Sequence, residues 1–335
     1  QRVAVDISNR NTRKSLLGID YKMPVALAPV GLLGMQRADG EILAAQAAEN
    51  FGIPFTLSTM SICSIEEVAR NTSKPFWFQL YVMRDHDFAK RLVERAKAAE
   101  CSALVLTLDL QILGQRHADI RNGLSVPMKI KMSNVFDLIS KPNWCFEMAR
   151  SKNRTFGNIM GHVKDIKNLT SLTKWVQGQF DTKLNWDDVK RIKDWWGGKL
   201  IIKGIMDPDD AKMAQECGAN ALVVSNHGGR QLDGVNSSIS TLPEIKKAVS
   251  NIDVLMDGGI SSGQDILKAI ALGAEGVMIG RSFVYGLSAK GKEGVINALE
   301  ILNKELDMTM ALCGRRDIKD VDRAIIKDCP FFEKN

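Results

Sequence analysis

The chain has 335 residues, of which 45% are hydrophobic and 25% are charged. This composition is typical of a globular protein and excludes an intrinsically disordered chain, and the length suits two average domains or one large α/β barrel. The net charge is +6 and the basic residues are spread along the chain, so nucleic-acid binding is not indicated. The mild positive bias favours small anionic substrates or an acidic lipid surface.

The sequence shows no signal peptide and no apolar run long enough to span a bilayer. The chain opens at Gln1 without a methionine, so we expect that an N-terminal piece is missing. We predict a cytoplasmic protein with reduced thiols and no metal site, because neither a CxxC motif nor a metal-site His spacing accompanies the six cysteines, which are Cys63, Cys101, Cys145, Cys217, Cys313 and Cys329.

Apolar runs alternate with amphipathic helical patterns along most of the chain. The runs predict eight strands, at 23–31, 54–58, 76–82, 103–109, 199–204, 221–224, 254–259 and 276–281. The helical patterns lie at 39–50, from 64 onward, at 85–99, 187–196, 208–217, 242–249, 263–272 and 293–313. Eight strand-then-helix units imply a (β/α)₈ barrel, and we predict that residues 1–335 form a single domain of this kind.

A long insertion, residues 110–185, interrupts the alternation after the fourth strand. It carries aromatic residues among bases, and its segment 121–154 has a net charge of +5, from seven bases (Arg121, Lys129, Lys131, Lys141, Arg150, Lys152 and Arg154) against two acids (Asp137 and Glu147). One interpretation is a lid over the barrel mouth. The other is a basic, aromatic surface in 121–154 that contacts a membrane or a redox partner.

Polar residues gather at the carboxyl ends of the predicted strands, where barrel enzymes carry their active sites. Burying such residues inside apolar strands costs free energy unless partners or a ligand satisfy them, so as a set they indicate a site. The candidate site residues at these strand ends, the polar ones and the small or apolar ones beside them, are Pro29, Val30, Gly31, Ser58, Gln79, Tyr81, Thr107, Asp109, Lys203, His227, Arg230, Asp257, Gly258, Gly259, Gly280 and Arg281.

The stretch from Ser225 to Gly234, SNHGGRQLDG, directly follows the sixth predicted strand. An imidazole such as that of His227 can take a proton near neutral pH, and the guanidinium of Arg230 can hold a carboxylate through two parallel hydrogen bonds. A lone histidine at a strand end is more often structural than catalytic. The histidine and the arginine together suit a site for a small carboxylate with His227 as its base, and a structural histidine stays the alternative at this point.

Two further features predict binding of a phosphorylated ligand. The glycine-rich loops 257–263 and 279–281 follow the last two strands, where this barrel commonly cradles phosphate on backbone amides and a helix N-terminus. Ordinary glycine turns are the alternative.

Lys203 at the fifth strand end suits either a Schiff base or a fixed cation beside a ring that gains negative charge on reduction.

The stretch from Ser225 to Gly234 resembles the signature of the FMN-dependent 2-hydroxy acid dehydrogenases and oxidases, the family of glycolate oxidase and mandelate dehydrogenase. The similarity runs from about Asp6 to the final helix, and is greatest to the bacterial flavin L-lactate dehydrogenase branch, in Pro24 to Gly31, Trp77 to Val82 and the basic insertion. The resemblance implies FMN as cofactor, and the oxidation of an L-2-hydroxy acid, most simply L-lactate to pyruvate, with electrons passed to quinone or another carrier. It also implies a homotetramer, and a position in the cytoplasm or on the inner face of the membrane.

The resemblance also assigns roles to individual residues. His227 is implied to be the base, steadied by Asp109, with Lys203 as the cation beside the flavin. The substrate is implied to lie against Tyr81, Arg116, His227 and Arg230. The implied FMN contacts are Pro29, Val30, Gly31, Ser58, Gln79, Thr107, Lys203 and Ser225 around the ring, and Asp257, Gly258, Gly259, Ser261, Gly280 and Arg281 around the ribityl chain and phosphate.

The sequence departs from the family pattern in two places. Family members usually have an N-terminal segment with a tyrosine that contacts the substrate, and the given sequence starts downstream of that segment. Ser261 stands where the family usually places an arginine at the FMN phosphate, which predicts weaker FMN retention. Three alternatives stay open. They are an oxidase that uses O₂, although Gly31 in place of a common alanine favours a dehydrogenase; a non-redox barrel such as a type 2 isopentenyl diphosphate isomerase; and an inactive binding remnant.

Overall fold

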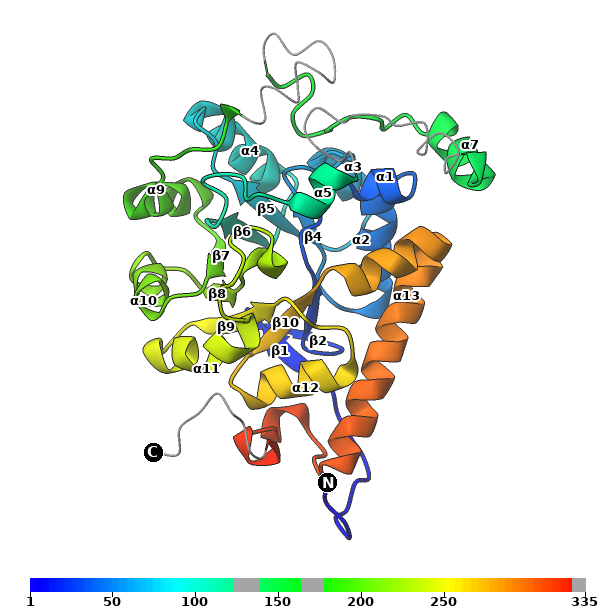
Figure 1. Ribbon diagram of the computed structural model, residues 1–335, viewed down its shortest axis with the longest axis vertical. Coiled ribbons are helices and arrows are strands. Elements are labelled where there is room, and N and C mark those ends of the chain that lie inside the picture. The colour runs from blue at the N-terminus through cyan, green and yellow to red at the C-terminus, as the bar shows by residue number, and fades with distance from the viewer. Residues whose placement is uncertain (123–138, 164–177, 327–335) are drawn as a thin grey trace.

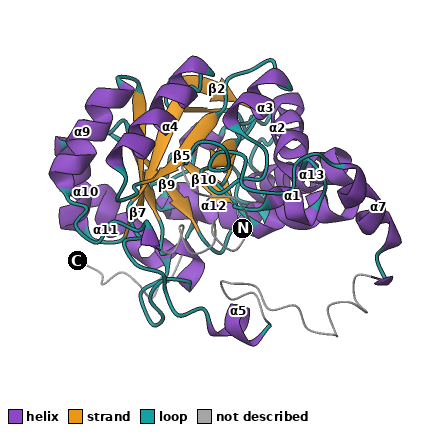
Figure 2. Cartoon of the chain, turned by 90° about the horizontal axis from the view of Figure 1, so that it is seen from above, coloured by secondary structure: helices purple, strands orange, loops and turns teal. Residues whose placement is uncertain are grey.

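The protein is represented by a computed structural model, which describes residues 1–122, 139–163 and 178–326. Eight parallel strands form one sheet in the order β3-β10-β9-β8-β7-β6-β5-β4. The sheet closes where Leu27 bridges Phe55 in parallel and the Leu27 amide donates to the Pro54 carbonyl at 2.9 Å. The predicted barrel is therefore confirmed, and Figure 2 shows its strands enclosed by helices. The strands are β3 Val25–Leu27, β4 Thr56–Ser58, β5 Trp77–Tyr81, β6 Ala103–Thr107, β7 Lys199–Ile205, β8 Ala221–Val224, β9 Asp253–Asp257 and β10 Gly276–Ile279.

Helices follow the strands and pack around the barrel (Figure 1). Local sequence signals account for several of their starts: Ser64 forms the predicted capping box with Glu67, and Ser262 forms another with Asp265. The helices are α1 Leu33–Gln36, α2 Gly40–Phe51, α3 Ile65–Arg70, α4 His86–Ala98, α5 His117–Arg121, α7 Pro142–Arg150, α9 Trp186–Trp196, α10 Pro208–Glu216, α11 Ser238–Ala248, α12 Gly263–Ala271 and α13 Arg281–Leu312, with the short 3₁₀ turns η1 His227–Gly229, η2 Ile318–Asp320 and η3 Arg323–Ile325.

The buried residues form two cores, one on each side of the strands. The larger core lies between the strands and the surrounding helices. The smaller core fills the inside of the barrel and includes Trp77, Val105, Ile201, Val223 and Leu255. Because side chains alternate between the two faces of a strand, the residue two positions after each of these inner-core residues also faces the inside of the barrel. The barrel is thus apolar at depth and polar toward its carboxyl end.

A short antiparallel hairpin, β1 Lys14–Leu16 and β2 Ile19–Tyr21, plugs the amino end of the barrel. Leu16 and Leu17 belong to the inner core, and the Leu17 amide donates to Asp253 at the start of β9 at 3.0 Å. A Cβ on Gly276 would lie 2.7 Å from Leu16 Cδ2, so β10 begins with a glycine where the plug enters. This hairpin was not predicted, because each of its strands has only three residues.

The final helix differs from its prediction at 293–313. α13 begins at Arg281, and its backbone is interrupted at Lys290 and Gly291. A Cβ on Gly286 would lie 2.3 Å from the Gly294 carbonyl oxygen, so the two halves pack backbone against backbone. Glycines weaken a helical pattern, which explains why the first half was not predicted. α11 likewise begins at Ser238, before the predicted position 242.

The insertion leaves the barrel after β6 and contains α5 and α7 among its described residues. Trp144 Nε1 donates to the Met35 carbonyl at 3.0 Å and Arg37 pairs with Glu147 at 2.7 Å, which together attach α7 beside α1. Residues 123–138 and 164–177 of the insertion, and Cys329 near the end of the chain, lie outside the described residues. Within the described parts of the chain, no helix has both the length and the apolar character that a membrane crossing requires.

Candidate active site

The inward-facing polar residues meet at the carboxyl end of the barrel. The register places Gln79 beside Val105, Tyr81 beside Thr107, and Thr107 beside Lys203. The same inward alternation continues to Asp109 after β6 and Ser225 after β8. Six of the predicted site residues are at most 9% exposed, namely Ser58, Gln79, Thr107, Lys203, Ser225 and Asp257.

Lys203 lies at the centre of this layer, with a side chain that is 5% exposed. Its ammonium pairs with the Asp257 carboxylate at 2.9 Å and donates to the Ser225 hydroxyl at 2.8 Å. Burial disfavours the charged ammonium, but the carboxylates of Asp257 and Asp109 outweigh it and keep the pKa of Lys203 above its ordinary value. A permanent positive charge therefore lies inside the barrel mouth. This environment argues against a Schiff-base role, which requires a neutral amine.

His227 and Asp109 form a close pair beside Lys203. His227 Nδ1 lies 3.0 Å from Asp109 Oδ1 and 3.1 Å from Oδ2. An ionised carboxylate only accepts hydrogen bonds, so Nδ1 carries the proton and Nε2 keeps the free electron pair of a base. The His227 backbone has φ +56°, a left-handed conformation that is uncommon outside glycine and is often found at active sites.

The predicted carboxylate-binding arginines reach the same mouth from two loops. Arg116 Nη2 donates to the Gln231 Oε1 at 3.1 Å, while its buried Nε has no partner among the described residues. Arg230 pairs with Asp119 of α5 at 3.1 Å through one nitrogen, and its side chain is 52% exposed. Such an exposed ion pair contributes little free energy, so Arg230 can exchange it for another carboxylate.

Tyr81 ends β5 close to these charged groups. Burial raises the pKa of Tyr81 to about 12, so its hydroxyl stays protonated at neutral pH and can donate a hydrogen bond. Its amide donates to the Thr59 hydroxyl at 3.2 Å, which ties the end of β5 to the loop after β4.

The loop after β3, which carries Pro29, Val30 and Gly31, packs against the loop after β4. A Cβ on Gly31 would lie 3.3 Å from Met60 Cβ, tighter than an ordinary contact. The Ser58 hydroxyl donates to Gln79 Oε1 at 3.1 Å, which fixes the orientation of the Gln79 amide. Pro29 and Val30 are half-buried beside this contact.

The two glycine loops after β9 and β10 are open. Gly259 and Gly280 have no atom within 4 Å of an added Cβ, and Gly280 immediately precedes the long helix α13. Arg281, the first residue of that helix, is exposed. The Ser261 hydroxyl instead donates to the Asp265 carboxylate of α12 at 3.1 Å, so it is already hydrogen-bonded within the protein.

Two residues that the sequence analysis did not single out help to hold the site. Gln231 Nε2 donates to the carbonyls of Asp109 and Ile112, which joins the signature loop to the segment after β6. Asn158 is fully buried and donates to the Ser61 hydroxyl at 2.9 Å, which anchors the returning insertion beside the β4 loop. Gln231 lies inside the signature and could have been noticed there, whereas nothing in the sequence around Asn158 indicates its contacts.

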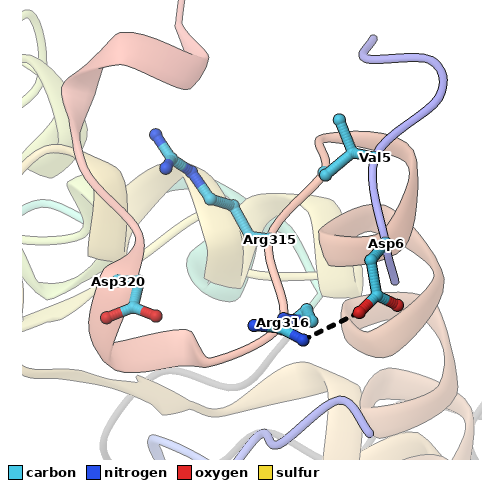
Figure 3. Close-up of a pocket in the computed structure, with 6 residues that line it drawn as sticks. Val5, Asp6, Arg315, Arg316 and Asp320 are labelled. Carbon is cyan, nitrogen blue, oxygen red and sulfur yellow. Dashed lines mark hydrogen bonds and ion pairs between the residues drawn. The ribbon is translucent and has the colours of Figure 1, made fainter. Parts of the chain in front are cut away.

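A separate surface pocket lies between the N-terminal segment and the segment after α13 (Figure 3). Asp6 pairs with Arg316 across it at 2.9 Å. None of its lining residues is a predicted site residue, and we assign it no function.

The comparisons with known proteins agree with this architecture. The family model of FMN-dependent dehydrogenases matches residues 1–328. A protein of Actinobacillus pleuropneumoniae serotype 5b named L-lactate dehydrogenase is 46% identical over 330 residues, which cover 98% of this chain and 86% of that protein. A protein of Caulobacter sp. with the same name is 44% identical over 328 residues, 97% of this chain and 86% of its own length.

Two solved structures are also similar to this chain over most of its length. The monotopic membrane protein (S)-mandelate dehydrogenase is similar with a TM-score of 0.92 and 34% identity, over 98% of this chain and 87% of that one. A mandelate oxidase variant with (S)-mandelic acid is similar with a TM-score of 0.79 and 34% identity, over 96% and 83% of the two chains.

The chain belongs to the FMN-dependent dehydrogenase family and is an enzyme that uses FMN. Within that family its resemblance to the L-lactate dehydrogenase branch is confirmed by relatives that carry this name.

The residues present fit FMN. Gln79 Nε2, Thr107 Oγ1 and Asp257 Oδ1 are buried polar atoms without a hydrogen-bond partner among the described residues. Unpaired buried polar atoms are costly, and three of them around one mouth match the polar edge and ribityl hydroxyls of a flavin nucleotide.

Proposed function

We propose that this protein oxidises L-lactate to pyruvate with FMN as the electron acceptor. The main observation behind this proposal is the His227–Asp109 pair, which provides an oriented base near Arg116 and Arg230 at the barrel mouth. The choice of L-lactate as substrate rests on the relatives that are named L-lactate dehydrogenase. Reduction of the bound FMN by L-lactate in the absence of O₂ tests it.

Different side chains of the protein bind the substrate, orient it and accept its proton. Arg230 and Arg116 bind the substrate carboxylate, and the Tyr81 hydroxyl donates to the substrate hydroxyl. His227 Nε2 takes a proton from the substrate, and Asp109 stabilises the imidazolium that results. FMN, when bound, would supply the acceptor for the two electrons and for the second proton that the substrate loses in becoming a 2-oxo acid.

We further propose which residues hold the cofactor. Pro29, Val30, Gly31, Ser58, Gln79, Thr107, Lys203 and Ser225 surround the ring, and Lys203 supplies the fixed positive charge that favours an electron-rich ring. The ribityl chain and phosphate lie against Asp257, Gly258, Gly259, Ser261, Gly280 and Arg281. The Ser261 hydroxyl is already bonded to Asp265, so Arg281 and the open glycine amides carry most of the phosphate binding.

We propose quinone or another carrier as the final electron acceptor, rather than O₂. A Cβ at position 31 would press on Met60, so Gly31 shapes this wall of the mouth, where many oxidases carry alanine. The relatives named L-lactate dehydrogenase favour an oxidoreductase over the isomerase alternative. Little peroxide should accumulate when O₂ is the sole acceptor.

Arg230→Lys tests the proposed carboxylate contact. The ammonium of lysine cannot offer the forked pair of donors, so we expect the dissociation constant for L-lactate to rise by about 10- to 100-fold with a smaller change in the limiting reduction rate. Anaerobic stopped-flow reduction over a range of L-lactate concentrations separates the two quantities. An unchanged dissociation constant would place the substrate carboxylate elsewhere.

The described part of the insertion presents an apolar and basic surface, which we propose contacts an anionic membrane. Phe146 of α7 is 61% exposed, Ile139 is 69% exposed, and Arg150 lies 5.1 Å from the Phe146 ring centroid. Aromatic and basic side chains together are typical of proteins that lie on a bilayer surface. The similar mandelate dehydrogenase structure is described as a monotopic membrane protein.

Phe146→Ser is expected to lower binding to vesicles that contain anionic lipid by about 3- to 10-fold while L-lactate still reduces the FMN. Ile301→Ser is the matched control, because Ile301 is similarly exposed, at 59%, but belongs to α13 and not to the insertion. Vesicle co-sedimentation measures both. Equal losses from the two variants would mean that α7 is not the contact surface.

A further inference from the structure

Strand β7 contains an irregularity directly after Lys203. Its register against β8 shifts between Lys203 and Ile205, so Gly204 forms a bulge in an otherwise regular strand. Gly204 has φ +103°, a backbone conformation that residues with a side chain rarely adopt. Bulges of this kind commonly redirect side chains next to active sites.

The bulge lies against Asp109, which follows the neighbouring strand β6. A Cβ on Gly204 would lie 2.8 Å from both Cβ and Cγ of Asp109, and 3.0 Å from its backbone nitrogen. Contacts under 3.0 Å are essentially never seen for real Cβ atoms, so any side chain at this position would displace Asp109. Asp109 in turn lies 3.0 Å from His227 Nδ1, a distance that leaves no slack for such a shift.

We infer that Gly204 is a positioning residue for the proposed reaction. Its missing side chain lets Asp109 rest on the β7 backbone at the place where the carboxylate reaches His227. Gly204 itself touches neither the base nor the substrate and acts only through Asp109. The inference rests on the proposed function, in which His227 is the base and Asp109 orients it.

Gly204→Ala should lower the limiting rate of flavin reduction by L-lactate by about 10- to 100-fold, because the base loses its orientation. FMN content and the dissociation constant for L-lactate should stay within about two-fold, since Arg230 and Arg116 are untouched. Gly52→Ala is the matched control: Gly52 has φ +89° at the end of α2, and an added Cβ there meets only Lys22 Cβ at 3.8 Å. The control should reduce at the wild-type rate.

A double-mutant cycle with Asp109→Gly separates positioning from a general structural role. Asp109→Gly removes both of the atoms that lie 2.8 Å from the added Cβ. In that background Gly204→Ala should lower the reduction rate by less than about three-fold. An equal loss in both backgrounds would overturn the inference, because Gly204 would then act through Lys203 or the barrel itself.

Two further outcomes are decisive. If Gly204→Ala alone does not fold, the Gly204→Ala/Asp109→Gly protein should recover soluble, FMN-containing enzyme, and a failure to recover would overturn the inference. If Gly204→Ala reduces as fast as the wild type, only this inference fails. If Asp109→Gly itself reduces at the wild-type rate, the proposed role of Asp109 fails as well.

Discussion

Replacing His227 with alanine is expected to leave FMN bound and to slow its reduction by L-lactate by about 10²- to 10⁴-fold, the usual contribution of a positioned base. The cofactor stays because the unpaired atoms that fit FMN belong to Gln79, Thr107 and Asp257. The flavin absorption spectrum measures retention, and anaerobic stopped-flow mixing measures the rate.

His86→Ala provides the matched control for this variant. His86 Nε2 pairs with Asp181 at 2.8 Å, so the substitution removes another His–Asp contact, outside the proposed site. Reduction in the control should stay at the wild-type rate. A His227→Ala protein that loses its flavin would show instead that this histidine is structural.

Replacing Lys203 with methionine is expected to lower the free energy of unfolding by about 3–5 kcal/mol, because it leaves the Asp257 carboxylate buried without its cation. The same change removes the positive charge from the barrel mouth, so FMN binding and reduction should both weaken. Denaturant titration of the variant and the wild type under identical FMN concentrations measures the stability difference.

The double variant Lys203→Met/Asp257→Asn identifies the cause of that loss. It should be more stable than Lys203→Met alone, because no unpaired charge stays buried. Lys212→Met is the surface control: Lys212 pairs with Asp209 at 2.8 Å in solvent, and its loss should change stability little. A double variant less stable than the single one would mean that Lys203 stabilises the protein by packing, not by its charge.

The barrel could be predicted from the sequence because its strands are short apolar runs separated by capped helices and glycine turns. Buried parallel strands require such runs, and Ser64 with Glu67 forms the capping box that its spacing indicated. The β1–β2 hairpin could not be predicted, since three-residue strands carry no periodic signal and gain their stability from packing into the barrel.

The site was predictable to the extent that it depends on the alternation of side chains. Gln79, Thr107 and Lys203 were expected at the mouth, and the structure places them there because they share the inward face of neighbouring strands. The partners of Arg230 and of Ser61 were not predictable. Asp119 and Asn158 come from the insertion, and their contacts depend on how distant loops pack, which no local pattern records.

The proposed oxidation of L-lactate is tested most directly by an anaerobic titration of the purified, FMN-containing protein with L-lactate. We expect the flavin absorbance near its visible maximum to fall as L-lactate is added, with one pyruvate formed for each FMN reduced. A flavin spectrum that stays unchanged by L-lactate and by other small L-2-hydroxy acids would contradict the account.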